Sequence, residues 1–171
     1  MFHAFDSTGP NRAGTCDGTR AEWMALLARA PLPLMEQALR PHSGGQAQWL
    51  RRPETGLYMV QGRAGGTGER FNLGEITVTR CALRAEEDAE APVGVAYVLG
   101  RSHRQAELAA LADALLQQPQ HREALEGALL APIRRHLALL QAKQQARVQA
   151  TKVDFFTVAR EAGTADDEED A

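Results

Sequence analysis

Hydrophobic residues recur at steps of three or four near the start of the chain, which is the spacing of one face of an α-helix. A first stripe begins at Trp23 and stops at Pro31, and a second stripe covers residues 33–39 and stops before Pro41. Thr19, with a glutamate three positions later, has the sequence of a capping box. We therefore expect a helix to begin directly after Thr19 and a second, short helix to follow it.

The same periodicity returns in the second half of the chain. Leucines and alanines form one stripe over residues 108–115 and another over residues 125–140. Ser102, with a glutamine three positions later, predicts the start of the first of these helices. Pro119 is expected to end that helix, and Pro132 to kink or restart the next one, because proline cannot continue a helix from within.

Alternating hydrophobic and polar residues predict three β-strands between the two helical regions. They cover residues 57–61, 73–83 and 93–99. The third is apolar on both faces, which favours a central position or coverage by helices. Together the patterns predict an α+β fold, in which a small antiparallel sheet of three or four strands packs with N-terminal and C-terminal helices.

The second strand has one apolar and one polar face. We expect the core to receive Ile76, Val78 and Ala82. The opposite, polar face is expected to hold Glu75, Thr77, Thr79 and Cys81. Arg80 shares the apolar face, so it needs a carboxylate or another anion if it is buried.

Composition limits the domain to residues 19–161. Residues 1–18 are rich in small polar residues without periodicity and predict a disordered tail, and residues 162–171 predict an acidic, disordered one. The five consecutive acidic residues that begin at Asp166 contribute −5, so removing them from the net charge of −3 leaves +2. That charge is too small for a general nucleic-acid interface.

The cysteines and the hydropathy predict a cytoplasmic protein. Cys16 and Cys81 are far apart in the sequence, which favours neither a disulfide framework nor a metal site. The start of the chain does not resemble a signal peptide, and no segment approaches the ~20 apolar residues of a membrane span. We expect no membrane association and no metal.

The loop between the first two strands is the strongest candidate for chemistry. Gly65, Gly66 and Gly68 lie between Arg63 and Arg70. Consecutive glycines allow backbone amides to converge on an anion, and arginines add charge-assisted donors. An ordinary glycine-rich hairpin turn explains the same residues. The loop lacks the Gly-Lys-Ser/Thr ending of a nucleotide P-loop, so both interpretations remain open.

Two further groups have a functional and a structural interpretation. Cys81 is either a nucleophile beside the polar strand residues or a small buried thiol. His103 and Arg104 either bind an anion at a helix start or belong to a capped, solvated turn. In both cases the structural interpretation is favoured.

Residues 151–158 are apolar again, close to the acidic tail, and include Phe155 and Phe156. Such a segment either folds back onto its own core or docks on another subunit. The two phenylalanines are therefore candidates for partner docking.

Four segments in combination resemble the PhnG family, the small subunit of the bacterial carbon-phosphorus lyase system. They are RAEWMALLARAP (20–31), ETGLYMVQGRAGGTGERFNLGEITVTRC (54–81), AYVLGRSHRQAELAALADALLQ (96–117) and TKVDFFTVARE (151–161). The resemblance covers residues 20–161 and excludes both tails.

This resemblance implies a complex with PhnI, PhnH and PhnJ and a functional link to PhnL. In that system an alkylphosphonate displaces adenine from MgATP and gives an α-D-ribose 1-phosphonate 5-triphosphate. The PhnI-like subunit is implied to carry the transfer, so this chain is expected to be an accessory subunit that is not catalytic alone and binds no cofactor itself. The sequence has no cysteine triplet for an iron-sulfur cluster and no P-loop.

We expect Arg63, Arg70 and Arg80 to help order the active-site region of the large synthase subunit. One alternative is a purely structural protein that ties subunits together through Phe155 and Phe156. Another is an independent phosphate-binding protein.

Overall fold

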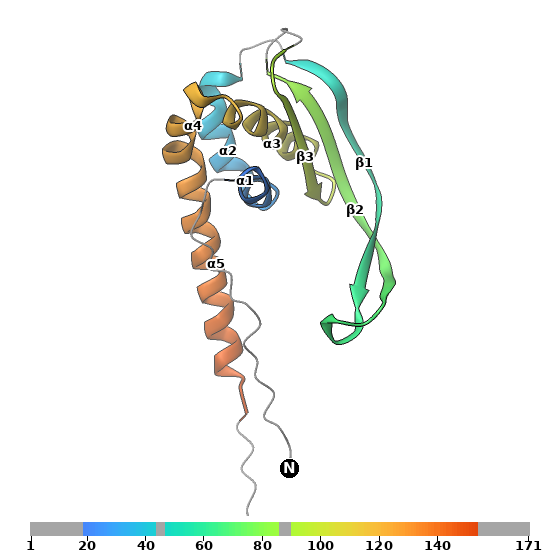
Figure 1. The fold of residues 1–171 in the computed structure, drawn as a ribbon. Coiled ribbons are helices and arrows are strands. Elements are labelled where there is room, and N and C mark those ends of the chain that lie inside the picture. The colour runs from blue at the N-terminus through green and yellow to red at the C-terminus, as the bar shows by residue number, and fades with distance from the viewer. Residues whose placement is uncertain (1–18, 44–46, 86–89, 154–171) are drawn as a thin grey trace, which may run out of the picture. The chain divides into compact units, whose positions relative to one another are not determined.

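The computed structural model describes residues 19–43, 47–85 and 90–153 (Figure 1). The chain divides into two compact units, residues 1–138 and 139–171. The first unit contains the sheet and all the helices of the described residues except the later part of the last one.

Two short helices open the first unit. α1 (Arg20–Leu27) begins after Thr19, as the capping box predicts, and the Thr19 backbone N–H donates to Glu22 at 3.3 Å. α2 (Leu32–Leu39) is followed by a 3₁₀ turn over Arg40–His42. Each helix buries two hydrophobic side chains in the core: Trp23, Leu27, Met35 and Leu39.

The sheet has three antiparallel strands in the order β1 (Gln48–Arg63), β2 (Arg70–Arg84) and β3 (Val93–Leu99). The predicted α+β fold with an antiparallel sheet is confirmed. β3 is an edge strand, so the alternative of a central position is wrong. β1 begins nine residues earlier than predicted. Its early part contains Pro53 and two register shifts, which an edge strand tolerates and which hide its alternation.

The remaining helices follow the strands. α3 (His103–Leu116) begins at Ser102, whose hydroxyl accepts a hydrogen bond from the Gln105 N–H at 3.3 Å. α4 (Pro119–Leu125), a π-helical turn over Glu126–Leu130 and α5 (Ala131–Ala150) come next. Pro119 opens α4, where a missing N–H costs little. Pro132 follows the π-helical turn directly, inside a helical stretch that continues from α4 without a break. The part of α5 from Leu139 onward belongs to the second unit.

The helices of the first unit lie on one side of the sheet, and α3 packs directly against it (Figure 1). The closest approach is at Gly94, where a Cβ atom would lie 1.9 Å from the carbonyl oxygen of Ala110. Only a glycine on β3 allows α3 to come this near. Alanines on α3 keep that helix narrow on the same side: Ala106, Ala109, Ala110 and Ala114 are all buried.

The predicted orientation of β2 is wrong. Its buried side chains are Thr79, Cys81 and Leu83, while Ile76, Val78 and Ala82 lie on the opposite face, away from the core. A period of two shows which residues share a face, but it does not show which face is covered. The small Thr79 and Cys81 side chains fit beneath the helices, and the Thr79 hydroxyl is hydrogen-bonded there.

Part of the sheet extends beyond β3. β3 pairs with β2 only from Val78 to Arg84. Residues 57–77 therefore form a two-stranded hairpin, which we call the arm. We call the sheet face opposite the helices the outer face, and the face toward them the inner face.

Candidate functional site

The tip of the arm is a tight glycine turn. Gly65 and Gly66 have φ values of 59° and 80°, which other residues rarely adopt. The Gly68 N–H donates to the Ala64 carbonyl at 3.0 Å, and Arg63 Nη1 donates to the Gly68 carbonyl at 3.3 Å. The glycines thus meet the demands of the turn, and the Gly68 amide is already used within it.

Arg63 and Arg70 lie directly opposite each other where the strands meet this turn. Paired residues share a face of a sheet, so the two exposed guanidinium groups lie on the same side. Like charges in such a pair repel each other. The pair is therefore suited to a carboxylate or phosphate group that contacts both arginines.

Arg80 lies elsewhere. Its Nε donates to Glu54 Oε1 at 2.6 Å, and Arg51 donates to the same oxygen at 2.8 Å. The hydrogen bond from Arg80 lowers the pKa of the exposed Glu54 carboxyl below its usual value. Arg63 lies nine positions after Glu54 along β1, or about 30 Å away at the rise of a β-strand. The structure thus places the three predicted arginines at two separate locations.

Hydrophobic side chains cover the outer face between these two locations. The register places on it Tyr58, Val60, Ile76, Val78, Tyr97 and Leu99. A shallow hollow of about 280 Å³ lies over this face, lined by residues that include Tyr58, Tyr97, Gly56 and the Glu54–Arg80 pair. The outer face therefore combines a continuous apolar surface with an ion pair at one end.

A hydrogen-bonded chain joins the base of the arm to α3. The buried Thr79 hydroxyl donates to the Gly100 carbonyl at 2.7 Å, so it accepts from the Thr55 hydroxyl at 3.0 Å. Thr55 in turn accepts from His103 Nε2 at 3.0 Å. This order requires a proton on Nε2 of His103. His103 thus fixes the start of α3 to β1.

Arg104 pairs with two carboxylates of its surroundings, Glu107 at 3.1 Å and Glu36 at 3.7 Å. Its contacts, like those of His103, fit the capped turn rather than an anion site. Neither residue points to a ligand.

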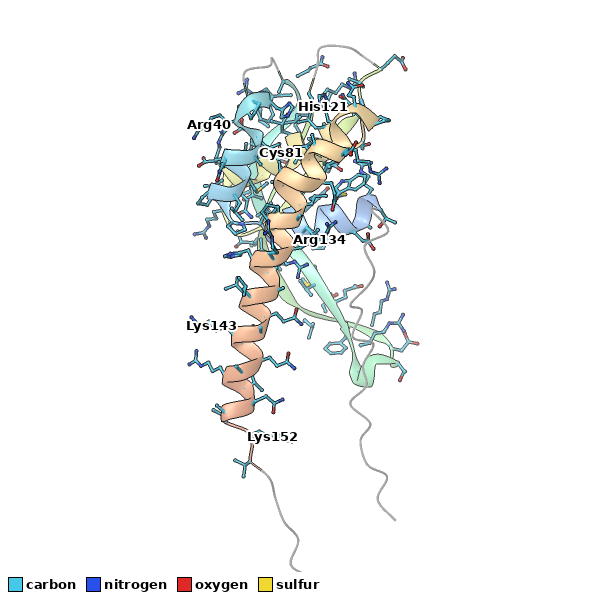
Figure 2. All side chains as sticks on the ribbon, turned by 90° about the vertical axis from the view of Figure 1, so that its left-hand side faces the viewer. Arg40, Cys81, His121, Arg134, Lys143 and Lys152 are labelled. Atoms are coloured by element: carbon cyan, nitrogen blue, oxygen red, sulfur yellow. The ribbon has the colours of Figure 1, made fainter. Side chains whose placement is uncertain are left out.

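Cys81 lies where the helices cover the sheet (Figure 2) and is almost completely buried. Burial, with a smaller effect of the negative Glu107, raises the pKa of its thiol to about 11. Such a thiol is protonated at neutral pH, so it fits a small core residue and not a nucleophile.

Asp113 is the polar residue that sequence reasoning missed. Its carboxylate is fully buried and accepts hydrogen bonds from Arg20 Nη2 at 2.7 Å, Trp23 Nε1 at 2.8 Å and the Val95 N–H at 2.9 Å. The hydrogen bond to Asp113 raises the pKa of Arg20. A single acidic residue in the apolar run 108–116 was the available signal, because a charge there must be paired.

The remaining predictions concern the two phenylalanines, metal binding and membrane association. Phe155 and Phe156 lie outside the described residues. Among residues 19–43, 47–85 and 90–153, no three His, Cys, Asp or Glu side chains come together as a metal site would require. No helix within those ranges is both long and apolar enough to cross a membrane.

Comparison with known proteins identifies a family and a curated relative. The family model described as phosphonate metabolism protein PhnG matches residues 18–161. A protein of Rhizobium meliloti (strain 1021), named alpha-D-ribose 1-methylphosphonate 5-triphosphate synthase subunit PhnG, is 40% identical over 142 residues. That alignment covers 82% of this chain and 88% of the relative.

Proposed function

Because the chain belongs to the PhnG family of phosphonate metabolism proteins, we propose that it is an accessory subunit of a carbon-phosphorus lyase complex. The single observation that carries this proposal is the 40% identity, over 88% of its length, to a relative named as a synthase subunit. The exposed apolar surface of the sheet adds support, since such surfaces mark protein interfaces.

In this function the chain acts with PhnI-, PhnH- and PhnL-type proteins, and the complex also holds a PhnJ-type subunit. An alkylphosphonate displaces adenine from MgATP, and the product is an α-D-ribose 1-alkylphosphonate 5-triphosphate. The reacting groups bind to the large PhnI-type subunit. The contribution of this chain is to order that subunit, and MgATP is a substrate of the complex.

The residues proposed to carry this role are Arg63, Arg70 and Arg80. Arg63 and Arg70 present two exposed cations, paired across the hairpin, at the arm tip. Glu54 holds Arg80 in a fixed position beside the hollow. Changing all three to alanine should lower phosphonate-dependent adenine release at least about tenfold, the effect of losing about 1.4 kcal/mol of transition-state stabilisation, while the complex still assembles.

The proposal is tested by co-expressing the PhnI-, PhnH- and PhnL-type proteins with and without this chain. Adenine release from MgATP and methylphosphonate is then measured. We expect release to collapse without the chain and the isolated chain to be inert. Undiminished release without it would refute the accessory role. If release depends on the chain but the triple alanine variant retains it fully, the chain is instead a structural tie between subunits.

A further inference from the structure

Large hydrophobic side chains are exposed on both faces of the arm. On the outer face Tyr58 is 61% exposed and Leu73 is 62% exposed. On the inner face Leu57 is 66% exposed and Met59 is 41% exposed. Leu73 belongs to the outer face because its side chain lies where a Cβ atom added at Gly62 would point, and Gly62 lies on that face by register. By register the inner face also carries the exposed Glu75, Gln61 and Asn72, so its hydrophobic part is the half nearest the base of the arm.

A two-stranded hairpin of this kind is only marginally stable in water unless a third strand or another layer packs on it. The pairing of β3 ends at Val78, so the described part of the chain provides the arm with no third strand. Nearly every residue from 57 to 77 is exposed. The missing layer must come from outside the arm.

We propose that the arm inserts into a cleft of a different subunit of the complex. The walls of the cleft are apolar against the outer face and against Leu57 and Met59 on the inner face, and its inner end carries a carboxylate that faces Arg63 and Arg70. This inference rests on the proposed function, because it takes the partner from the same assembly. It goes further by naming the interacting segment and the chemistry of the surface that receives it.

A second copy of this chain fits the arm less well. A two-fold contact uses the same patch on both copies. Packing through the outer face buries Tyr58 and Leu73 but leaves Leu57 and Met59 in water. That contact also leaves Arg63 and Arg70 without a carboxylate, because both lie on the inner face.

The charge pattern identifies the inner end of the cleft. Arg63 and Arg70 share the inner face of the arm at its tip, where they repel each other in the free chain. A carboxylate is a planar acceptor that two guanidinium groups can contact together. Its presence in the partner converts this repulsion into an attraction and fixes how far the arm enters.

The first test removes the arm. Residues 58–76 are replaced by Asn-Gly, a sequence suited to a two-residue hairpin turn between Leu57 and Thr77. Affinity-tagged wild-type chain and the trimmed variant are titrated against purified PhnI-, PhnH- and PhnJ-type subunits, and Kd is measured. The wild type should bind one of them, and trimming should weaken that binding at least about thirtyfold, as expected for loss of a central hydrophobic anchor. Unchanged binding overturns the proposal.

The second test asks whether both faces are covered. Tyr58→Ser with Leu73→Ser alters the outer face, and Leu57→Ser with Met59→Ser alters the inner one. Each pair should weaken binding at least about tenfold. Leu139→Ser is the matched control, because Leu139 is 71% exposed but lies outside the arm. If only one face matters, the partner is a flat surface and the cleft is refuted.

The third test concerns the tip. Arg63→Glu with Arg70→Glu should weaken binding at least about tenfold through repulsion of the carboxylate, and the exposed Arg40→Glu should leave it unchanged. If the reversal alters only the KM for MgATP and not the subunit Kd, the tip faces substrate and the carboxylate is refuted.

The oligomeric state of the isolated chain completes the set. A monomer by analytical ultracentrifugation is expected, and an arm-dependent dimer would assign the arm to a second copy. Because Kd is measured without turnover, these results are independent of whether adenine release requires the chain. The proposed function and the arm's role can therefore fail separately.

Discussion

The Asp113 carboxylate gathers α1, α3 and β3 at one buried point. Two of its donors are the buried Trp23 indole and the partly buried Val95 amide, whereas the Arg20 side chain is nearly half exposed. Removal of Asp113 and removal of Arg20 should therefore lower the free energy of unfolding by different amounts.

Asp113→Ala should lower the free energy of unfolding by about 3 kcal/mol or more, since buried donors lose a charged acceptor. Arg20→Ala should cost about 1 kcal/mol, because water reaches the vacated site. Urea denaturation followed by circular dichroism measures both. Equal costs for the two variants would show that the ion pair, and not the buried hydrogen bonds, holds the three elements together.

Cys81 predicts a pH dependence of stability. Its thiol pKa is raised from 9.0 to about 11 in the folded chain, so the folded state keeps a proton that the unfolded state loses between these values. Stability is then fully present below pH 9 and falls as the pH rises toward 11. In a Cys16→Ser background, the free energy of unfolding should drop more from pH 8 to pH 10 than it does in Cys81→Ala with the same background.

The same background gives a chemical check. Iodoacetamide should label Cys81 at pH 8 only after denaturant is added, because the native thiol is buried and protonated. Rapid labelling of the native chain would contradict both the burial and the raised pKa.

At the scale of elements, the contact between α3 and β3 depends on one missing side chain. Gly94→Ala would place its Cβ against the backbone of α3, and we expect it to lower the free energy of unfolding by about 3 kcal/mol or more, at the upper end of overpacking costs. Gly56→Ala is the matched control in the same sheet, because nothing lies within 4 Å of its added Cβ. Thermal unfolding of both variants measures the difference, and similar melting temperatures would contradict the proposed contact.

The positions of helices and strands were predicted from the sequence more successfully than the faces that they bury. Capping residues and prolines act locally, so the starts of α1 and α3 agree with the pattern, and α3 ends before Pro119. The side of β2 that is covered depends on where α3 comes to lie, which is not a local property. Bulky Ile76 and Val78 suggested the core, but the tight approach of α3 selects Thr79 and Cys81 instead.

The candidate site shows the same limit. The glycine loop and its arginines were recognisable because turn chemistry is local. The distance between Arg80 and the tip of the arm was not predicted, since it follows from the length of β1, which is much longer than its alternation suggests. Asp113 stood out only as one charge within an apolar run, and its partners come from segments about 20 and 90 residues away in sequence.

At the scale of the whole molecule, the core lies in the first unit, because among the residues that the structure describes every buried core side chain precedes residue 139. A chain that stops after Ala138 should therefore unfold within about 0.5 kcal/mol of the full chain, the usual range for surface changes. A chain that stops after residue 128 loses the buried Leu129, Leu130 and Ile133 and should fail to fold. Urea denaturation of both truncations checks this, and a large loss in the first would show that the second unit stabilises the core.

The exposed arm also has a consequence for protein supply in the cell. A copy without its partner displays Tyr58, Leu57 and Leu73 to the solvent, and these are the kind of apolar groups through which unassembled chains aggregate or are degraded. If the arm docks as proposed, surplus copies should be short-lived, while assembled copies persist. The abundance of this chain should then follow that of the subunit that receives its arm, and turnover as well as synthesis would maintain the stoichiometry of the complex.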